Sequence, residues 1–196
     1  MKKNVIALLG VTSVGLLLGG CATQSSSNSQ SSEKSSVVKK SKSNVKIVKI
    51  NKTSNQVGPL KVHVSNIKYE KVENKESNWT DAEYNMEGHP KKDLNKYYYR
   101  AIVSLKFENT GDKSVDLSYG ERTYTVDDGT AFPIQSGANG SSFESSVAKI
   151  APHGKLAETV ILISNNKFTA NKLQVTFTDI CENMDTTLSE GGTAKI

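Results

Sequence analysis

The sequence predicts an all-β protein, an antiparallel β-sandwich of about seven strands with one short helix in a long loop and a disordered tether before it. From Gly58 onward, apolar residues recur at every second position in short stretches. A period of two places alternate side chains on opposite faces of a strand. Gly, Pro, Asn and Asp separate the stretches, as expected for turns between the strands of a sandwich. Residues 58–196 have the length of one domain.

The chain begins with the features of a secretion signal. Lys2 and Lys3 precede an apolar run from Val5 to Leu18, which is too short to span a bilayer but has the length of a signal-peptide core. We therefore expect residues 1–20 to be a signal peptide. The run ends in Leu18-Gly19-Gly20-Cys21, which resembles the lipobox of bacterial lipoproteins.

The lipobox resemblance implies cleavage between Gly20 and Cys21 and a lipid on Cys21. The protein would then be anchored by lipid to the cell membrane, on its extracellular face, and two acyl chains suffice for stable attachment. The alternatives are an ordinary secreted protein with an incidental thiol at Cys21, and a plain transmembrane anchor. With Cys21 lipidated, Cys181 is the only cysteine left, so we expect no intramolecular disulfide.

Residues 21–57 are predicted to form a flexible tether. Residues 22–44 are mostly Ser, Lys, Asn and Gln, which bury too little apolar surface to offset the entropy of ordering. An edge strand over Val45–Ile50 remains open. The lysines of the tether suit contacts with anionic lipid headgroups or anionic wall polymers, although a plain soluble spacer is the favoured explanation. These lysines are Lys34, Lys39, Lys40, Lys42, Lys46, Lys49 and Lys52.

The clearest strand of the predicted sandwich is Tyr97–Phe107, in which two sets of alternating residues differ in polarity. The set expected to face the core is Tyr97, Tyr99, Ala101, Val103, Leu105 and Phe107. The set expected to face solvent is Tyr98, Arg100, Ser104 and Lys106. The pattern predicts a central strand with one buried face.

The remaining predicted strands are shorter. They are Leu60–Tyr69, Val115–Ser118, Arg122–Val126, Ala131–Ile134, Leu156–Ile163 and Leu173–Phe177. In the first of them the apolar positions change parity, which predicts a bulge near Ser65-Asn66. Asp127-Asp128-Gly129 has the composition of a tight hairpin turn.

A long and mostly polar excursion separates Tyr69 from Tyr97, and excursions of this length are usually functional or disordered. Within it, Thr80-Asp81-Ala82-Glu83 fits a capping box. This motif predicts a helix over Asp81–Glu87, with Gly88 as its C-terminal stop. Trp79 and Tyr84 fall at the two positions that a hydrophobic staple joins.

Three groups of turn residues resemble a known family. They are Phe107–Asp112, Val126–Gly129 and Ile150–Lys155. Together they resemble the immunoglobulin-like domains of unknown function in Gram-positive surface lipoproteins, which are related in fold to a secreted mycobacterial immunoprotective antigen. The resemblance covers about residues 58–180 and implies an immunoglobulin-like β-sandwich at the cell surface. It implies no catalytic residues, and the excursion after the first strand departs from the family's pattern.

The positive charge of the chain lies mainly outside the predicted domain. Residues 1–61 hold ten Lys or Arg and one Glu, a net +9, whereas residues 62–196 hold fifteen Lys or Arg and nineteen Asp or Glu, a net −4. A nucleic-acid partner needs a positive stripe on the folded part. The distribution therefore argues against nucleic-acid binding.

The excursion holds the candidate partner-binding residues. Trp79, Tyr84, Met86 and His89 lie together in it, and residues of these types are enriched where proteins contact their partners. The staple explains Trp79 and Tyr84 without a partner, so both interpretations stay open. The leading hypothesis is a non-enzymatic binding or interaction module whose partner is an unknown protein of the cell envelope.

Two other functions remain as alternatives. Cys181 with a distant histidine would make a small thiol enzyme, although a free cysteine at a strand end usually packs as a small apolar residue. An accessory solute-binding lipoprotein is the second alternative, although one sandwich lacks the second lobe that such clefts need. His63, His89 and His153 show no metal-ligand spacing, so we predict neither a metal nor a cofactor.

Overall fold

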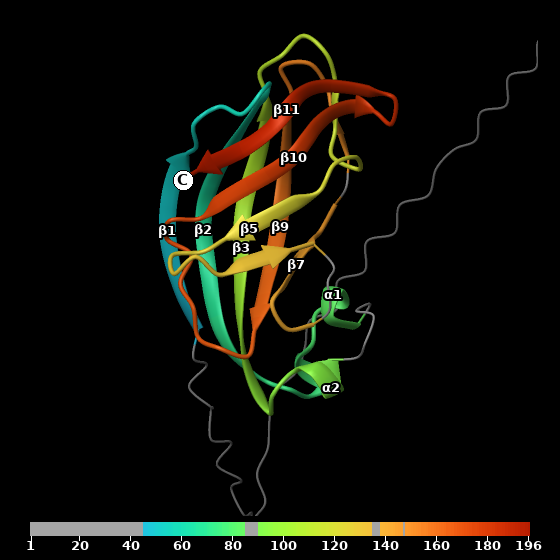
Figure 1. The fold of residues 1–196 in the computed structure, drawn as a ribbon. Helices are drawn as coiled ribbons and strands as arrows, with labels where there is room; N and C mark the ends of the chain where they lie inside the picture. Colours follow the sequence, from blue (N-terminus) through green and yellow to red (C-terminus); the bar gives the residue numbers. More distant parts are fainter. Residues whose placement is uncertain (1–44, 85–89, 135–137, 147) are drawn as a thin grey trace, which may run out of the picture. The chain divides into compact units, whose positions relative to one another are not determined.

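The computed structural model describes residues 45–84, 90–134, 138–146 and 148–196 (Figure 1). All of them belong to one compact unit. The predictions for the signal peptide, for Gly20 and Cys21 and for residues 22–44 lie outside the described residues, as do those for Met86, Gly88 and His89.

Two antiparallel sheets form the fold, so the predicted β-sandwich is confirmed. The larger sheet contains, in spatial order, β1 (Val45–Thr53), β2 (Leu60–Glu73), β3 (Tyr97–Asn109), β9 (Lys155–Ser164) and β7 (Ser141–Glu144). The smaller one contains β11 (Thr186–Lys195), β10 (Gln174–Asn183), β5 (Arg122–Thr125) and β6 (Ala131–Pro133). A separate short pair consists of β4 (Val115–Asp116) and β8 (Lys149–Ile150).

The described residues contain eleven strands rather than about seven. Each predicted strand has a counterpart, and β3 lies at the centre of the five-stranded sheet as expected. Outside the seven predicted strands are β7, β8 and β11, together with β1, which was raised only as an open alternative. They are short, or they lie at the edge of a sheet, where backbone hydrogen bonds hold a segment that has no regular apolar face.

The last part of the predicted tether belongs to the folded domain. β1 pairs with β2 from Val45 opposite Glu70 to Thr53 opposite His63, with a register shift between Lys49 and Lys52. The prediction of a tether over residues 21–57 is therefore wrong from Val45 onward, and the domain begins there rather than at Gly58. The edge strand left open for Val45–Ile50 is present.

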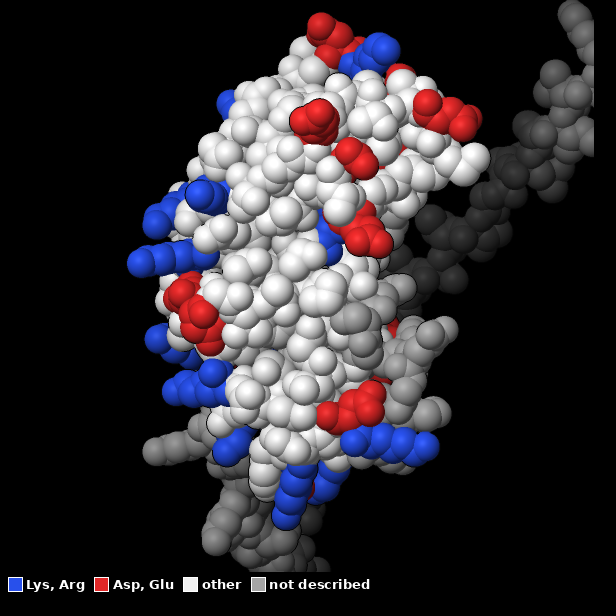
Figure 2. Space-filling view, viewed as in Figure 1, with Lys and Arg blue, Asp and Glu red and all other residues white. Residues whose placement is uncertain are grey.

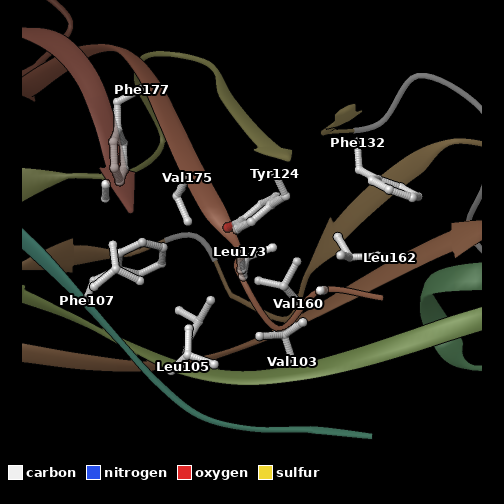
Figure 3. Close-up of a cluster of buried hydrophobic side chains, with 14 of the residues drawn as sticks. Val103, Leu105, Phe107, Tyr124, Phe132, Val160, Leu162, Leu173, Val175 and Phe177 are labelled. Carbon is white, nitrogen blue, oxygen red and sulfur yellow. The ribbon is translucent and has the colours of Figure 1, made fainter. Parts of the chain in front are cut away.

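The core lies between the inner faces of the two sheets (Figure 3). Val103, Leu105 and Phe107 of β3 are buried on the side that the alternation predicts. The ring of Phe107 meets Phe177 of the opposite sheet edge to face, with centroids 6.2 Å apart. The predicted bulge is confirmed, because the β2–β3 register shifts between Val64 and Asn66.

Two turns follow directly from local sequence. Gly129 has a φ of 86° in the predicted hairpin, a conformation that glycine adopts without steric cost. The side chain of Asn109 is buried and donates to the carbonyls of Lys113, at 2.7 Å, and Ala151, at 3.0 Å. Its amide thus joins the two turns that flank β3 and β9, which are both among the motifs behind the family resemblance.

The short helices all lie in the excursion between β2 and β3. They are the 3₁₀ turn η1 (Glu76–Asn78), α1 (Asp81–Tyr84) and α2 (Pro90–Asp93). One helix was predicted there, and α1 begins at its predicted first residue. Residues 85–87 of that prediction lie outside the described part of the chain. No described helix has the length and apolar character needed to cross a bilayer.

Candidate functional site

Residues 74–96, which we call the insertion, are held on one end of the outer face of the five-stranded sheet. A second apolar cluster, separate from the main core, makes this contact. The insertion contributes Leu94 and, at the margin, Ala82. The other members are Val72, Tyr98, Ala138, Phe143, Ile161 and Ile163.

Coverage by the insertion changes the environment of β3. Tyr98 is fully buried and Arg100 is only 8% exposed. The prediction that these two residues face solvent is therefore wrong, because Glu83 and Asn78, which contact them, lie 15 to 22 residues away in sequence. Their side chains do lie on the outer face of the sheet, as the alternation predicts, but that face is covered here.

The predicted capping box is present at the start of α1. The backbone N–H of Thr80 donates to Glu83 Oε2 at 2.6 Å, and the N–H of Glu83 donates back to Thr80 Oγ1 at 3.4 Å. These bonds pair two backbone donors that a helix N-terminus otherwise leaves without partners. The capping box also holds the Glu83 carboxylate in one orientation, because its Oε2 accepts from the Thr80 N–H.

Glu83 is the centre of a buried charged network. It has no exposed surface, and its Oε2 accepts from Arg100 Nη1 at 2.5 Å, while its Oε1 accepts from the Tyr98 hydroxyl. Arg100 also donates through Nε and Nη2 to Glu70 Oε2, at 2.9 and 2.6 Å. Lys68 adds a further ion pair to Glu70 at 2.7 Å.

The network favours the charged forms of Arg100 and Glu70. Burial acts against the charge of Arg100, but the carboxylates of Glu83 and Glu70 outweigh it and raise the pKa of Arg100. Burial likewise opposes the charge of Glu70, but hydrogen bonds and charge from Lys68 and Arg100 prevail, and its pKa is lowered. Burial and the bond to Glu83 raise the pKa of Tyr98, so this phenol stays neutral.

Trp79 and Tyr84 meet at the surface of the insertion. Their ring centroids are 5.4 Å apart in an edge-to-face arrangement, so the predicted staple is confirmed. Trp79 Nε1 donates to Asn74 Oδ1 at 3.0 Å, and the Tyr84 hydroxyl donates to the carbonyl of Glu76 at 3.0 Å. The Tyr84 side chain is nevertheless 55% exposed, which leaves much of its ring open to a partner.

The structure also shows the contacts of three other residues with reactive side chains, namely Cys181, Asp127 and His153. Cys181 is a buried free thiol, 4.0 Å from Thr187 Oγ1. Asp127 accepts from the backbone N–H of Lys172 at 2.7 Å, so it fastens its hairpin to the loop before β10. His153 lies beside Asp112 in an exposed turn. Within the described ranges, no three His, Cys, Asp or Glu residues are arranged to hold a metal ion.

A second buried network was not predicted. Arg122 donates through Nε and Nη2 to the two oxygens of Glu144, at 2.9 and 2.6 Å, and the Tyr124 hydroxyl donates to the same carboxylate at 2.5 Å. Burial and the charge of Glu144 raise the pKa of Tyr124. The sequence carried a signal here, because Arg122 shares its parity with the buried Tyr124 and Val126. An arginine on an apolar face needs a buried carboxylate partner.

Comparison with known proteins gives no family. No protein-family model matches the chain, and neither does any curated protein. A functionally unknown protein from Listeria monocytogenes EGD-e shares 13% identity, over 79% of this chain and 88% of its own, with a TM-score of 0.47.

Two further solved structures are similar at the same low level. A conserved hypothetical protein from Bacillus anthracis shares 13% identity over 80% of this chain and 99% of its own, with a TM-score of 0.40. An uncharacterized β-sandwich protein from Clostridium difficile 630 shares 10% identity over 75% and 91%, with a TM-score of 0.34. These likenesses say nothing about activity.

Proposed function

We propose that the protein is a membrane-anchored extracellular lipoprotein, without enzymatic activity, that binds another component of the cell envelope through the insertion. The leader and the Leu18–Cys21 motif support the anchor. The way in which the insertion is fastened to the sandwich supports the binding role, and this observation carries the proposal.

The buried network suits a surface that must keep one shape. Removing ionic groups from water costs several kcal/mol per ion, so apolar packing would fasten the insertion at lower cost. What Glu83, Arg100 and Glu70 add is direction, because the hydrogen bonds of the Arg100 guanidinium to the two carboxylates depend on their orientation. A segment held in this way loses little conformational freedom when a partner binds, and less of the binding energy is then spent on ordering.

The aromatic pair is the part of this surface to test first. Tyr84 is more than half exposed, and its position on α1 is fixed by the capping box and the network beneath it. Aromatic residues held rigidly at a surface provide large contact areas at low entropic cost. The experiment uses full-length, membrane-bound protein carrying Tyr84→Ala or Trp79→Ala, with Tyr119→Ala as the matched control because Tyr119 is also exposed, at 37%.

Binding and stability are measured on the same variants, by affinity capture from intact envelopes and by thermal melting. We expect Tyr84→Ala to weaken capture of a specific partner on the order of thirtyfold, the effect of losing about 2 kcal/mol at an interface. The cost in stability should be about 1 kcal/mol, for one hydrogen bond and one ring contact. Unchanged capture with both insertion variants would show that the partner, if any, binds elsewhere.

A further inference from the structure

The end of the outer sheet face that the insertion does not cover is rich in lysine. The strand register places five lysines on this face, which we call the basic face. The same face carries two carboxylates, those of Glu70 and Glu108. Glu70 pairs with Lys68 and Arg100, and Glu83 also pairs with Arg100, so these two cations and two carboxylates offset one another. The five are Lys49, Lys61, Lys68, Lys106 and Lys155.

The opposite side of the sandwich differs in charge. The outer residues in the middle of the four-stranded sheet are mostly uncharged, with Lys195 opposite Gln174 as a cation in these rows. The uncharged ones are Thr123, Thr125, Gln174, Thr176 and Thr193. Figure 2 shows this side, white over most of β10 and β5, with Lys and Arg side chains gathered along the edge that β1 forms. The five lysines of the basic face therefore lie on the side of the sandwich opposite these polar residues.

A shallow hollow of about 270 Å³ lies within the basic face. Thr53, His63, Lys106, Glu108 and Lys155 line it. They come from four adjacent strands, β1, β2, β3 and β9. Thr53, His63 and Lys106 stand side by side in one row, and the next residue of that row, on β9, is Ala157. A methyl group there leaves room beside the Lys106 side chain.

The hollow offers more donors and positive charge than its own acceptors satisfy. Lys155 Nζ lies 3.3 Å from Glu108 Oε2, which offsets one of the two ammonium groups. Lys106 forms no ion pair within the part of the chain that the structure describes. The Thr53 hydroxyl and His63 Nδ1 are hydrogen-bonded to each other at 3.0 Å, and both side chains line the same hollow.

We propose that this hollow binds a phosphate group, with Lys106 and Lys155 as its cationic ligands and Thr53 and His63 as neighbouring polar contacts. A lysine ammonium binds phosphate as a point charge with three donors. Donors that converge from four strands suit the oxygens of a tetrahedral anion, which point in several directions. The phosphate is inorganic phosphate or part of an anionic lipid headgroup. The site lies outside the insertion, so the test of phosphate binding is independent of the test of the proposed partner.

The test compares how fast each lysine is acetylated in the full-length protein on vesicles. The reference is the protein on phosphatidylcholine vesicles in chloride buffer. One arm adds inorganic phosphate at equal ionic strength, and the other replaces part of the lipid with phosphatidylglycerol. Mass spectrometry reads the rate at Lys106 and Lys155, and Lys167 and Lys195 serve as controls because they lie outside the hollow.

We expect acetylation of Lys106 and Lys155 to slow at least about threefold in one arm or both, while the two control lysines keep their rates. Slowing in the first arm identifies inorganic phosphate as a sufficient ligand, and slowing in the second alone identifies the lipid headgroup. Equal slowing at all four lysines, or none at Lys106 and Lys155, would overturn the proposal.

Two substitutions test whether the residues that line the hollow, and not only its net charge, determine phosphate binding. Glu108→Gln removes the carboxylate that competes with a phosphate for Lys155, so protection of Lys155 by phosphate should become stronger. Thr53→Val removes the hydroxyl with little change in shape and none in charge, so protection should weaken. A site that responds only to net charge would be indifferent to Thr53→Val, and that result would also reject the proposed ligand set.

Discussion

Arg100 and Arg122 each bring a full charge into a buried position, and each is held there by carboxylates. Arg122 meets Glu144 through two parallel hydrogen bonds, at 2.9 and 2.6 Å. Arg100 lies between Glu70 and Glu83. Both arrangements use the fork of donors that only a guanidinium has. We therefore expect these two residues to be among the least replaceable in the domain.

Replacing Arg100 tests the network beneath the insertion. Arg100→Gln leaves the buried Glu83 carboxylate without its cation, so we expect a loss of about 3–5 kcal/mol of unfolding free energy. Chemical denaturation measures it. Adding Glu83→Gln to the same chain should restore part of the loss, because the unpaired charge is then gone. A cost under about 1 kcal/mol for Arg100→Gln would contradict the buried network.

Cys181 tests the alternative of a thiol enzyme. Its side chain is 9% exposed and packs at the end of β10. We expect its thiol to react with a disulfide reagent at least about tenfold more slowly in the folded, lipidated protein than in urea, since a buried thiol is hard for the reagent to reach. Equal rates in the two states would mean an accessible thiol and would favour the enzyme hypothesis.

At the scale of elements, β1 is the strand whose contribution to the stability of the domain is least evident from its side chains. Most of its residues are exposed, Ile47 among them at 64%. It contributes backbone pairing along β2 and the contact of Ile50 with the main core. Its lysines lie along an open sheet edge, where charged residues discourage pairing with other chains.

Two deletions separate the tether from β1. Removing residues 22–44 should leave the melting temperature unchanged, whereas removing residues 22–53 should lower it. Loss of the edge strand leaves one side of β2 unpaired, and each kcal/mol lost corresponds to roughly 2–4 °C for a domain of this size. Calorimetry of both chains makes the comparison. If the two melted at the same temperature, β1 would contribute nothing to the fold.

At the scale of the whole molecule, the distribution of charge and the leader fit an orientation toward an anionic surface. The net charge of residues 62–196 is −4, yet the outer face of the five-stranded sheet carries five lysines, two of them from residues before 62. An uneven distribution of positive and negative charge over the surface orients a protein in an electric field more than its net charge does. In sequence, the residues that follow the proposed lipid site at Cys21 lead to β1, which begins at Val45.

The anchor itself is tested by Cys21→Ala. Because the Leu18–Cys21 motif is the only anchor visible in the sequence, we expect this substitution to release the protein from the membrane fraction. Fractionation followed by immunodetection measures the release, and mass spectrometry of the wild-type N-terminus should show the lipid. A variant that stays with the membrane, or an unmodified Cys21 in the wild type, would overturn the proposed anchor.

The sequence by itself determined the features that depend on neighbours in the chain. The alternation in β3 fixed which side of the strand faces the core, the change of parity in β2 marked its bulge, and Thr80 with Glu83 marked the start of α1. Each of these follows from interactions within a few residues, such as side-chain direction and capping.

Only the tertiary structure decided what covers each surface and which charges meet. Nothing near Arg100 in sequence shows that Glu83 is buried against it, and the hollow requires residues from four strands. β11, which contains Gly191 and Gly192, has a weak apolar pattern and is held by its pairing with β10. The physical reason is the same in each case: burial and pairing join residues far apart in the chain, and local propensity carries no record of them.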